Sequence, residues 1–311
     1  VDICKKYNPK AKILIGGTSE FPDLGADYYL YSYAENAIKP VLDDIKGITP
    51  IKHKMLHDGK WVNALHDYPS WPMKTYQYDF TERDFIQEDE VVTIEFARGC
   101  RFACKYCEFP LIGMKQDTSI SIDEMYNTFM YYHDTFGTTS FILAEDTFND
   151  RVIKMEKMAK AVQKLPFKPR VANFARIDLY HRFPEMIELA AASGIVSQAY
   201  GIETFNHETG KIIGKGLHPD KVKETLLHVN DYMEKHGIHN EHYGYCTWIV
   251  GLPNESVESI MSTHEWFKNF WYPHGSQAFA LRIFKHGNFL SAFSTDLGKY
   301  NYEEIENVKG I

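Results

Sequence analysis

The chain has 311 residues, of which 44% are hydrophobic and 24% are charged, and its formal net charge at pH 7 is −8. This composition is close to that of ordinary globular proteins and excludes a disordered or fibrous chain. The longest apolar runs, such as residues 245–252, are too short to span a membrane, and the negative charge gives no general attraction to nucleic acid. Neither a membrane nor a nucleic acid is therefore an expected partner.

The first 50 residues have the pattern of part of an α/β domain. Residues 12–15 predict a buried strand that runs into Gly16-Gly17, residues 27–30 predict a second strand, and residues 35–45 have the spacing of an amphipathic helix. The sequence opens on Val1 within a helical pattern and stops in an unfinished element. We therefore expect it to be a piece of a longer protein.

The next 40 residues, 51–90, show little periodicity and are rich in Pro, His, Asp, Trp and Tyr. They predict a structured linker with a hairpin around His57-Asp58-Gly59-Lys60. Helical segments further along have marked ends. Ser121 and Glu124 have capping-box spacing, Pro219 and Gly237 bracket another helix, and Asn254 or Ser256 can cap a helix over 257–270.

From residue 91 onward, strand-like runs alternate with helical ones. The six runs lie at about 92–97, 139–144, 170–174, 197–202, 243–250 and 277–283. Right-handed crossovers favour a parallel sheet, as a full or partial barrel or an open doubly wound sheet, and both place ligands at the carboxyl ends of the strands. We predict an α/β fold with a partial (βα)6 barrel over 91–290 and the start of a C-terminal extension over 291–311.

Three of the five cysteines, Cys100, Cys104 and Cys107, lie within eight residues directly after the first of these strands. Their crowding and the odd total argue against a disulfide scaffold and predict reduced thiols in the cytoplasm. The spacing is Cys-x3-Cys-x2-Cys, on a loop at the carboxyl end of a strand. Three thiolates on such a loop can bind three irons of a cubane cluster and leave the fourth iron open to a small molecule.

Other metal sites fit this loop less well. Structural zinc needs a second pair of ligands, and none follows Cys107 closely. An electron-transfer cluster needs a fourth protein ligand, which Cys246 or a nearby histidine could supply. Cys246 lies within a hydrophobic run, however, and we expect it to be a core residue, as we do Cys4.

The cysteine loop, with Arg98-Gly99 before Cys100 and Tyr106 before Cys107, resembles the signature of the radical S-adenosylmethionine (SAM) superfamily. The resemblance covers about residues 91–290 and includes segments 144–148, 175–178, 200–203 and 249–255 in order. Together they are similar to the branch that carries a cobalamin-binding-type domain ahead of the barrel. The resemblance implies a [4Fe–4S] cluster on the three cysteines and reductive cleavage of SAM to a 5′-deoxyadenosyl radical.

The resemblance also implies residues that bind SAM through its ammonium and carboxylate groups. Glu145 and Asp146 follow the second strand, where a carboxylate could bind the SAM ammonium. Asp146 or Asn149 could instead cap the following helix. Arg176 could pair with the SAM carboxylate or an anionic substrate, or form an ion pair with Asp178 or Glu203.

The resemblance implies that the remaining candidates lie near the ribose and adenine of SAM. Glu203 could hold the ribose diol or the ammonium, or form an ion pair, and Gly201 lets the backbone approach the ligand. Tyr106 is expected near adenine or simply packed in its loop, and Gly251 begins a turn that could support adenine. Lys215 lies in a Gly-Lys-Gly segment that lacks the full phosphate-loop pattern.

The N-terminal segment, residues 9–45, resembles the last third of a cobalamin-binding Rossmann-like domain. Gly16-Gly17 would lie along the nucleotide tail of the cofactor, so residues 1–50 are expected to be the end of such a domain. The Asp-x-His-x-x-Gly motif that supplies the cobalt ligand in that family is not among these residues. A His-off relative or a domain without the cofactor therefore fits equally well.

The reaction has three alternatives at this point. With cobalamin, the resemblance implies methyl transfer to an unactivated carbon; without it, a cyclisation, rearrangement or oxidation. The non-enzymatic alternative is an iron–sulfur module for electron transfer. The expected partners are a small-molecule or peptide substrate and an electron donor such as flavodoxin or ferredoxin.

Overall fold

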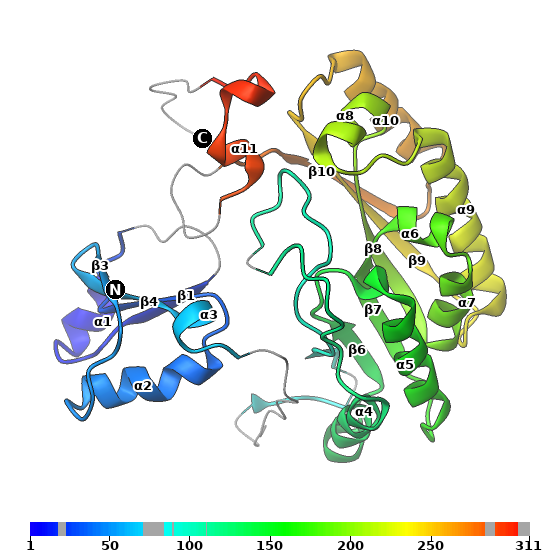
Figure 1. The fold of residues 1–311 in the computed structure, drawn as a ribbon. Helices are drawn as coiled ribbons and strands as arrows, with labels where there is room; N and C mark the ends of the chain where they lie inside the picture. Colours follow the sequence, from blue (N-terminus) through cyan, green and yellow to red (C-terminus); the bar gives the residue numbers. More distant parts are fainter. Residues whose placement is uncertain (18–22, 71–83, 89, 110, 284–289, 304–311) are drawn as a thin grey trace. The chain divides into compact units, whose positions relative to one another are not determined.

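The computed structural model describes residues 1–17, 23–70, 84–88, 90–109, 111–283 and 290–303 (Figure 1). The chain divides into two compact units. The first contains residues 1–74, 106–110 and 283–311, and the second contains residues 75–105 and 111–282. Residues 304–311 of the predicted C-terminal extension lie outside the described part. None of the described helices is long and apolar enough to cross a membrane.

The second unit is built on a six-stranded parallel sheet whose strands lie in chain order. They are β5 (Val92–Ile94), β6 (Ser140–Leu143), β7 (Arg170–Ala175), β8 (Ile195–Glu203), β9 (Tyr243–Val250) and β10 (Gly275–Ala280). A doubly wound sheet would reverse the strand order at a switch point, whereas a barrel keeps it. The order therefore confirms the α/β prediction and favours the partial barrel over the open sheet.

The crossover helices α5, α6, α7 and α9 lie along one face of this sheet (Figure 1). The helical segments are α4 (Ile122–Phe136), η2 (Phe148–Asp150), α5 (Val152–Gln163), α6 (Ile177–Arg182), α7 (Glu185–Ala192), α8 (His207–Ile213), α9 (Pro219–His236) and α10 (Val257–Phe270). The capping box of Ser121 and Glu124 is present before α4, and Ser256 rather than Asn254 caps α10. Gly237 follows the last residue of α9, as predicted.

The two faces of the sheet differ in burial. On β8, the buried side chains of Gln198 and Tyr200 face the helices, because Gln198 Nε2 donates to the hydroxyl of Tyr180 on α6 at 2.8 Å. Side chains alternate along a strand, so Ser197 and Ala199 point to the other side. The register of the paired strands shows which residues of the other five strands point to this same side. We call this side of the six-stranded sheet the open face.

His242 lies directly before β9 and is 7% exposed. Its Nδ1 donates to Asn230 Oδ1 at 2.9 Å, and its Nε2 has no hydrogen-bond partner in the part of the chain that is described. Burial, helped by nearby His274, lowers the pKa of His242 from 6.5 to about 4. The imidazole is therefore neutral in the folded protein near neutral pH.

This histidine predicts sensitivity to acid. Between pH 6.5 and about 4 the unfolded chain binds a proton at His242 that the folded chain does not, so the free energy of unfolding falls as the pH falls. The loss reaches about 2–3 kcal/mol near pH 4. Urea unfolding at neutral and acidic pH should show a smaller loss for His242→Gln, which keeps a hydrogen-bonding group for Asn230. The exposed control His264→Gln should match the wild type. The same pH dependence in all three proteins would show that His242 does not cause the loss of stability in acid.

The first unit contains a four-stranded sheet in the order β1-β2-β4-β3. Its strands are β1 (Leu14–Gly17), β2 (Tyr28–Tyr31), β3 (Lys54–Leu56) and β4 (Gly59–Asn63), and its helical segments are α1 (Asp2–Tyr7), α2 (Glu35–Ile45), α3 (Ala64–Asp67), α11 (Ala292–Thr295) and η3 (Gly298–Tyr300). The strands β1, β2 and β4 are parallel, and β3 pairs antiparallel with β4. This antiparallel pair is the hairpin predicted around His57 and Asp58, both of which have positive φ.

The central strand β2 is buried on both sides. Tyr28 and Leu30 belong to a core cluster with Ala37 and Val41 of α2, and Tyr29 and Tyr31 form a second cluster on the other side. The prediction that the first strand is buried was wrong. It lies at the edge of the sheet, where Leu14 is 37% exposed.

Candidate functional site at the carboxyl ends of the strands

The cysteine loop follows β5 and is fixed by its own backbone. Cys100 N donates to Leu111 O at 2.8 Å, and Met114 N donates to Cys100 O at 3.0 Å. Gly99 has a φ of +89°, and a Cβ at this position would lie 3.0 Å from Met114 Cγ and 3.1 Å from Leu111 O. The turn therefore requires glycine directly before the first cysteine.

Polar side chains contact the sulfurs of the first two cysteines. The Oγ1 atom of Thr147 lies 3.5 Å from Cys100 Sγ, and Arg176 Nη1 donates to Cys104 Sγ at 3.2 Å. A guanidinium beside sulfur stabilises the thiolate, which is the form that binds metal. Cys107 follows on the same loop, belongs to the first unit and is half-buried. None of the cysteines forms a disulfide.

Arg176, which follows β7, is held in place by Asp178. Its Nε and Nη2 donate to the two carboxylate oxygens of Asp178 at 3.0 and 2.8 Å, and its guanidinium lies 4.0 Å from the centre of the Phe102 ring. Burial opposes its charge, but Asp178 and Cys104 outweigh burial and raise the pKa of Arg176 above its usual value. The ion pair foreseen with Asp178 is thus present and orients Nη1 toward Cys104.

The neighbouring carboxyls of Glu145 and Asp146 have different surroundings. Glu145 is 4% exposed, and its Oε2 lies 2.8 Å from Nζ of the buried Lys154 on α5. Asp146 is less buried and close enough to Cys100 to add to the effect of burial in raising the pKa of that thiol. Burial raises the pKa of Asp146 itself to about 7, against the opposing charge of Lys154. Of the two, Asp146 is therefore the carboxyl with an electrostatic link to the cysteine loop.

Asn149 joins the ends of two strands. Its Nδ2 donates to Arg176 O at 2.9 Å, and its Oδ1 accepts from Arg176 N at 2.8 Å. No side-chain hydrogen bond caps η2 or α5, so the alternative in which Asp146 or Asn149 caps the next helix was wrong. Asn149 instead fixes the backbone from which the guanidinium of Arg176 extends.

Sequence reasoning missed Lys215. Its Nζ lies 2.8 Å from Glu203 Oε1 and donates to Gly201 O. A Cβ on Gly201 would lie 2.5 Å from Glu203 Oε1 and 3.1 Å from Lys215 Nζ, so this glycine leaves room for the ion pair. Lys105 N donates to Ile213 O at 3.1 Å, which packs the turn containing Lys215 against the cysteine loop. The sequence did offer one signal for this ion pair: Lys215 follows Glu203 by twelve residues, with only the short helix α8 between them.

The predicted turn after β9 is also present. Gly251 has a φ of +98°, and Leu252 N donates to Glu255 Oε2 at 3.3 Å. The hydroxyl of Thr209 on α8 donates to Pro253 O at 2.7 Å. The turn is therefore anchored to the segment that follows β8.

The two remaining cysteines lie in different places. Cys246 is fully buried in β9, in register with Tyr200 on the side of the sheet that faces the helices, as expected for a core residue. Cys4 is exposed on α1, so its predicted place in a core was wrong. In the described residues no group of three His, Cys, Asp or Glu side chains is arranged to hold a single metal ion. The cysteines of a cubane each bind a different iron.

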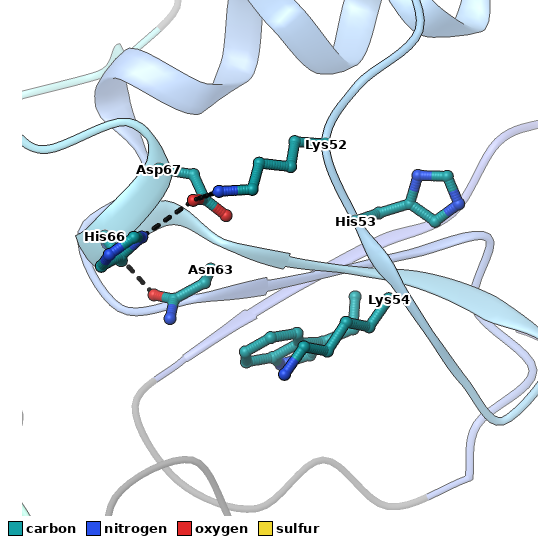
Figure 2. A pocket seen from close by; sticks show the side chains of 7 residues that line it. Lys52, His53, Lys54, Asn63, His66 and Asp67 are labelled. Carbon is teal, nitrogen blue, oxygen red and sulfur yellow. Dashed lines mark hydrogen bonds and ion pairs between the residues drawn. The ribbon is translucent and has the colours of Figure 1, made fainter.

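The first unit has a hollow of about 370 Å³ beside the β3–β4 hairpin (Figure 2). Lys52 Nζ lies 2.5 Å from Asp67 Oδ1, which is also 2.9 Å from His66 Nδ1. Lys54 extends over the ring of Trp61 at 5.6 Å. The carboxylate of Asp67 is therefore already paired within the hollow, and none of the predicted site residues lines it.

The comparison with protein families decides the identity of the second unit. The sequence matches the model of the radical SAM superfamily over residues 94–267, more than half of the chain. The chain belongs to the radical SAM superfamily. Membership implies a [4Fe–4S] cluster and SAM as cofactors, and the cysteine loop fits the cluster. Its thiols form no disulfide, and a guanidinium donates to one of the sulfurs.

Solved structures share the fold. TsrM from Kitasatospora setae, a radical SAM methyltransferase with cobalamin and a [4Fe–4S] cluster bound, is 13% identical with a TM-score of 0.56, over 70% of this chain and 41% of TsrM. OxsB, a cobalamin-dependent SAM radical enzyme with aqua-cobalamin and SAM bound, is 11% identical with a TM-score of 0.56, over 86% of this chain and 45% of OxsB. The chain thus spans less than half the length of either protein. No curated protein matches the sequence.

Proposed function

We propose that this chain is the radical-generating part of an enzyme that cleaves SAM reductively and uses cobalamin to transfer a methyl group to an unactivated carbon. The observation that carries the proposal is the cysteine loop at the carboxyl end of β5, with Arg176 donating to Cys104 at 3.2 Å. When bound, the reduced cluster supplies the electron that breaks the bond between sulfur and the ribose of SAM. The similarity to TsrM and OxsB supports the cobalamin part.

The charged residues of the site match the charged groups of SAM in this proposal. Asp146 binds the ammonium, which would favour the ionised carboxylate and so offset its raised pKa. Arg176 binds the carboxylate while Asp178 keeps the guanidinium in place. Glu203, held by Lys215, binds the ribose hydroxyls.

The uncharged parts of the proposed SAM site are Tyr106 and the turn at Gly251, which would contact adenine. Gly201 allows a close approach of the ligand to β8. The electron is expected from a protein donor such as flavodoxin or ferredoxin in the cytoplasm.

Anaerobic reconstitution with iron and sulfide tests the proposal. With SAM and dithionite the chain should form 5′-deoxyadenosine and methionine, and omission of dithionite should prevent both. Addition of hydroxocobalamin should give S-adenosylhomocysteine as well, because cobalamin that is reduced to its cobalt(I) form in the same dithionite mixture can accept the methyl group of SAM. A protein that binds iron and sulfide but never consumes SAM would refute the enzyme. Formation of 5′-deoxyadenosine alone, with or without cobalamin, would refute the methyl transfer.

A further inference from the structure

Large apolar side chains are exposed on the open face of the six-stranded sheet, each on a different strand. Their exposed fractions are 38% for Ile142 on β6, 52% for Phe174 on β7, 47% for Tyr243 on β9 and 46% for Phe279 on β10. The register places them on the same side as Ala199, since Phe174 pairs with Ala199 and Ala199 pairs with Tyr245, two residues from Tyr243. Ile142, Phe174 and Tyr243 lie around Ala172 and Ala199, whereas Phe279 pairs with Ile249 and lies nearer the carboxyl ends. Exposed apolar side chains that share one face mark a candidate binding surface.

The middle of the open face carries small residues and neutral polar side chains, among them Ser197, Thr247 and Gln277. Ala172, two residues before Phe174 on β7, and Ala199, the register partner of Phe174 on β8, carry only a methyl group. The hydroxyl of Tyr245 donates to Gln277 Oε1 on the neighbouring strand. A Cβ on Gly275 would lie 2.5 Å from the Tyr245 ring, so this glycine lets the ring approach β10 closely.

Charged side chains occur only at the two ends of this face in the residues that the structure describes. Arg170 and Glu241 form an ion pair at the amino end, and Arg176 and Glu203 lie at the carboxyl end. The positions between these ends are apolar, small or neutral on each of the six strands. A charged group that lies against these side chains would lose part of its hydration without gaining a partner of opposite charge.

We infer that the substrate is an uncharged, largely apolar small molecule that lies on the open face across β7, β8 and β9. This inference rests on the proposed function, because the same sheet carries the cysteine loop after β5 and the SAM-binding candidates at the carboxyl ends of its strands. The pair of Tyr245 and Gln277 offers one neutral polar contact.

Equilibrium dialysis of the reconstituted chain with three naphthalenes of similar size tests the inference. Uncharged 2-naphthol should bind at least about tenfold more tightly than anionic 2-naphthoate and cationic 2-naphthylmethylamine, a difference of about 1.4 kcal/mol. Phe174→Ala should weaken the binding of 2-naphthol about tenfold through loss of a ring contact. The control Phe270→Ala, which removes an exposed ring on α10, should leave it unchanged.

The inference is overturned if either charged compound binds as tightly as 2-naphthol or more tightly. It is also overturned if 2-naphthol does not bind, or if it binds Phe174→Ala as well as the wild type. The same preparation is assayed for SAM cleavage without any naphthalene, which keeps the two failures apart. A preparation that forms 5′-deoxyadenosine but prefers a charged naphthalene contradicts the inference alone. One that prefers 2-naphthol but never forms 5′-deoxyadenosine contradicts the proposed function.

Discussion

Replacement of Cys104 by alanine is expected to reduce 5′-deoxyadenosine formation to the level of a protein-free blank. Cys104 is the cysteine whose sulfur accepts from Arg176 at 3.2 Å, and two cysteines cannot hold a cubane as three do. The reconstituted wild type should contain about four irons per chain, and the variant much less. Iron analysis, visible absorption and chromatography of the SAM products measure the effect.

The matched control is Cys246→Ala. This cysteine is fully buried within β9, in register with Tyr200, and its loss should leave both iron content and SAM cleavage intact. The exposed Cys4 provides a second control through Cys4→Ala. Loss of the cluster in Cys246→Ala would indicate a fourth protein ligand and contradict an open iron, as would full activity in Cys104→Ala.

The largest effect on stability is expected from Lys154→Met. The Nζ atom of Lys154 lies 2.8 Å from Glu145 Oε2, 2.9 Å from Asp150 Oδ1 and 2.7 Å from Thr147 O, and the residue is 2% exposed. Burial opposes its charge, but the two carboxylates outweigh burial and raise the pKa of Lys154. Removal of the ammonium leaves the buried Glu145 without its cation and leaves Asp150 with Arg151, whose Nε lies 3.5 Å from Asp150 Oδ2. The free energy of unfolding should therefore fall by about 3–5 kcal/mol.

Urea unfolding of matched variants separates this effect from a general effect of methionine on α5. The control Lys160→Met changes an exposed lysine of the same helix and should stay within about 0.5 kcal/mol of the wild type. Addition of Glu145→Gln to Lys154→Met should recover part of the loss, because it removes the negative charge that has lost its cation. A Lys154→Met protein as stable as the Lys160→Met control would show that the buried ion pairs contribute little.

Much of the second unit could be predicted from its sequence because local patterns and fold agree there. The parallel strands follow from the alternation of apolar runs with helices, and the ends of α4 and α9 follow from Ser121, Glu124, Pro219 and Gly237. The cysteine loop after β5 could be predicted because the Cys-x3-Cys-x2-Cys spacing by itself indicates a metal cluster. These are features in which each residue acts through its near neighbours in the chain.

Contacts between distant residues could not be predicted in the same way. Glu145 and Asp146 are chemically alike and adjacent, and only the fold decides that the first meets Lys154 while the second lies near the cysteine loop. The pairing of Lys215 with Glu203 depends on how the turn after α8 returns to β8. The exposure of Leu14 depends on the place of β1 at a sheet edge, which the sequence of one strand does not specify.

Electron paramagnetic resonance of the reduced, reconstituted chain, recorded before and after addition of SAM, tests whether the cysteine loop leaves one iron free. Binding of SAM to that iron should change the spectrum of the cluster, and Cys246→Ala should show the same change. A cluster spectrum that SAM does not alter would mean that every iron already has a protein ligand, and it would contradict the proposed site.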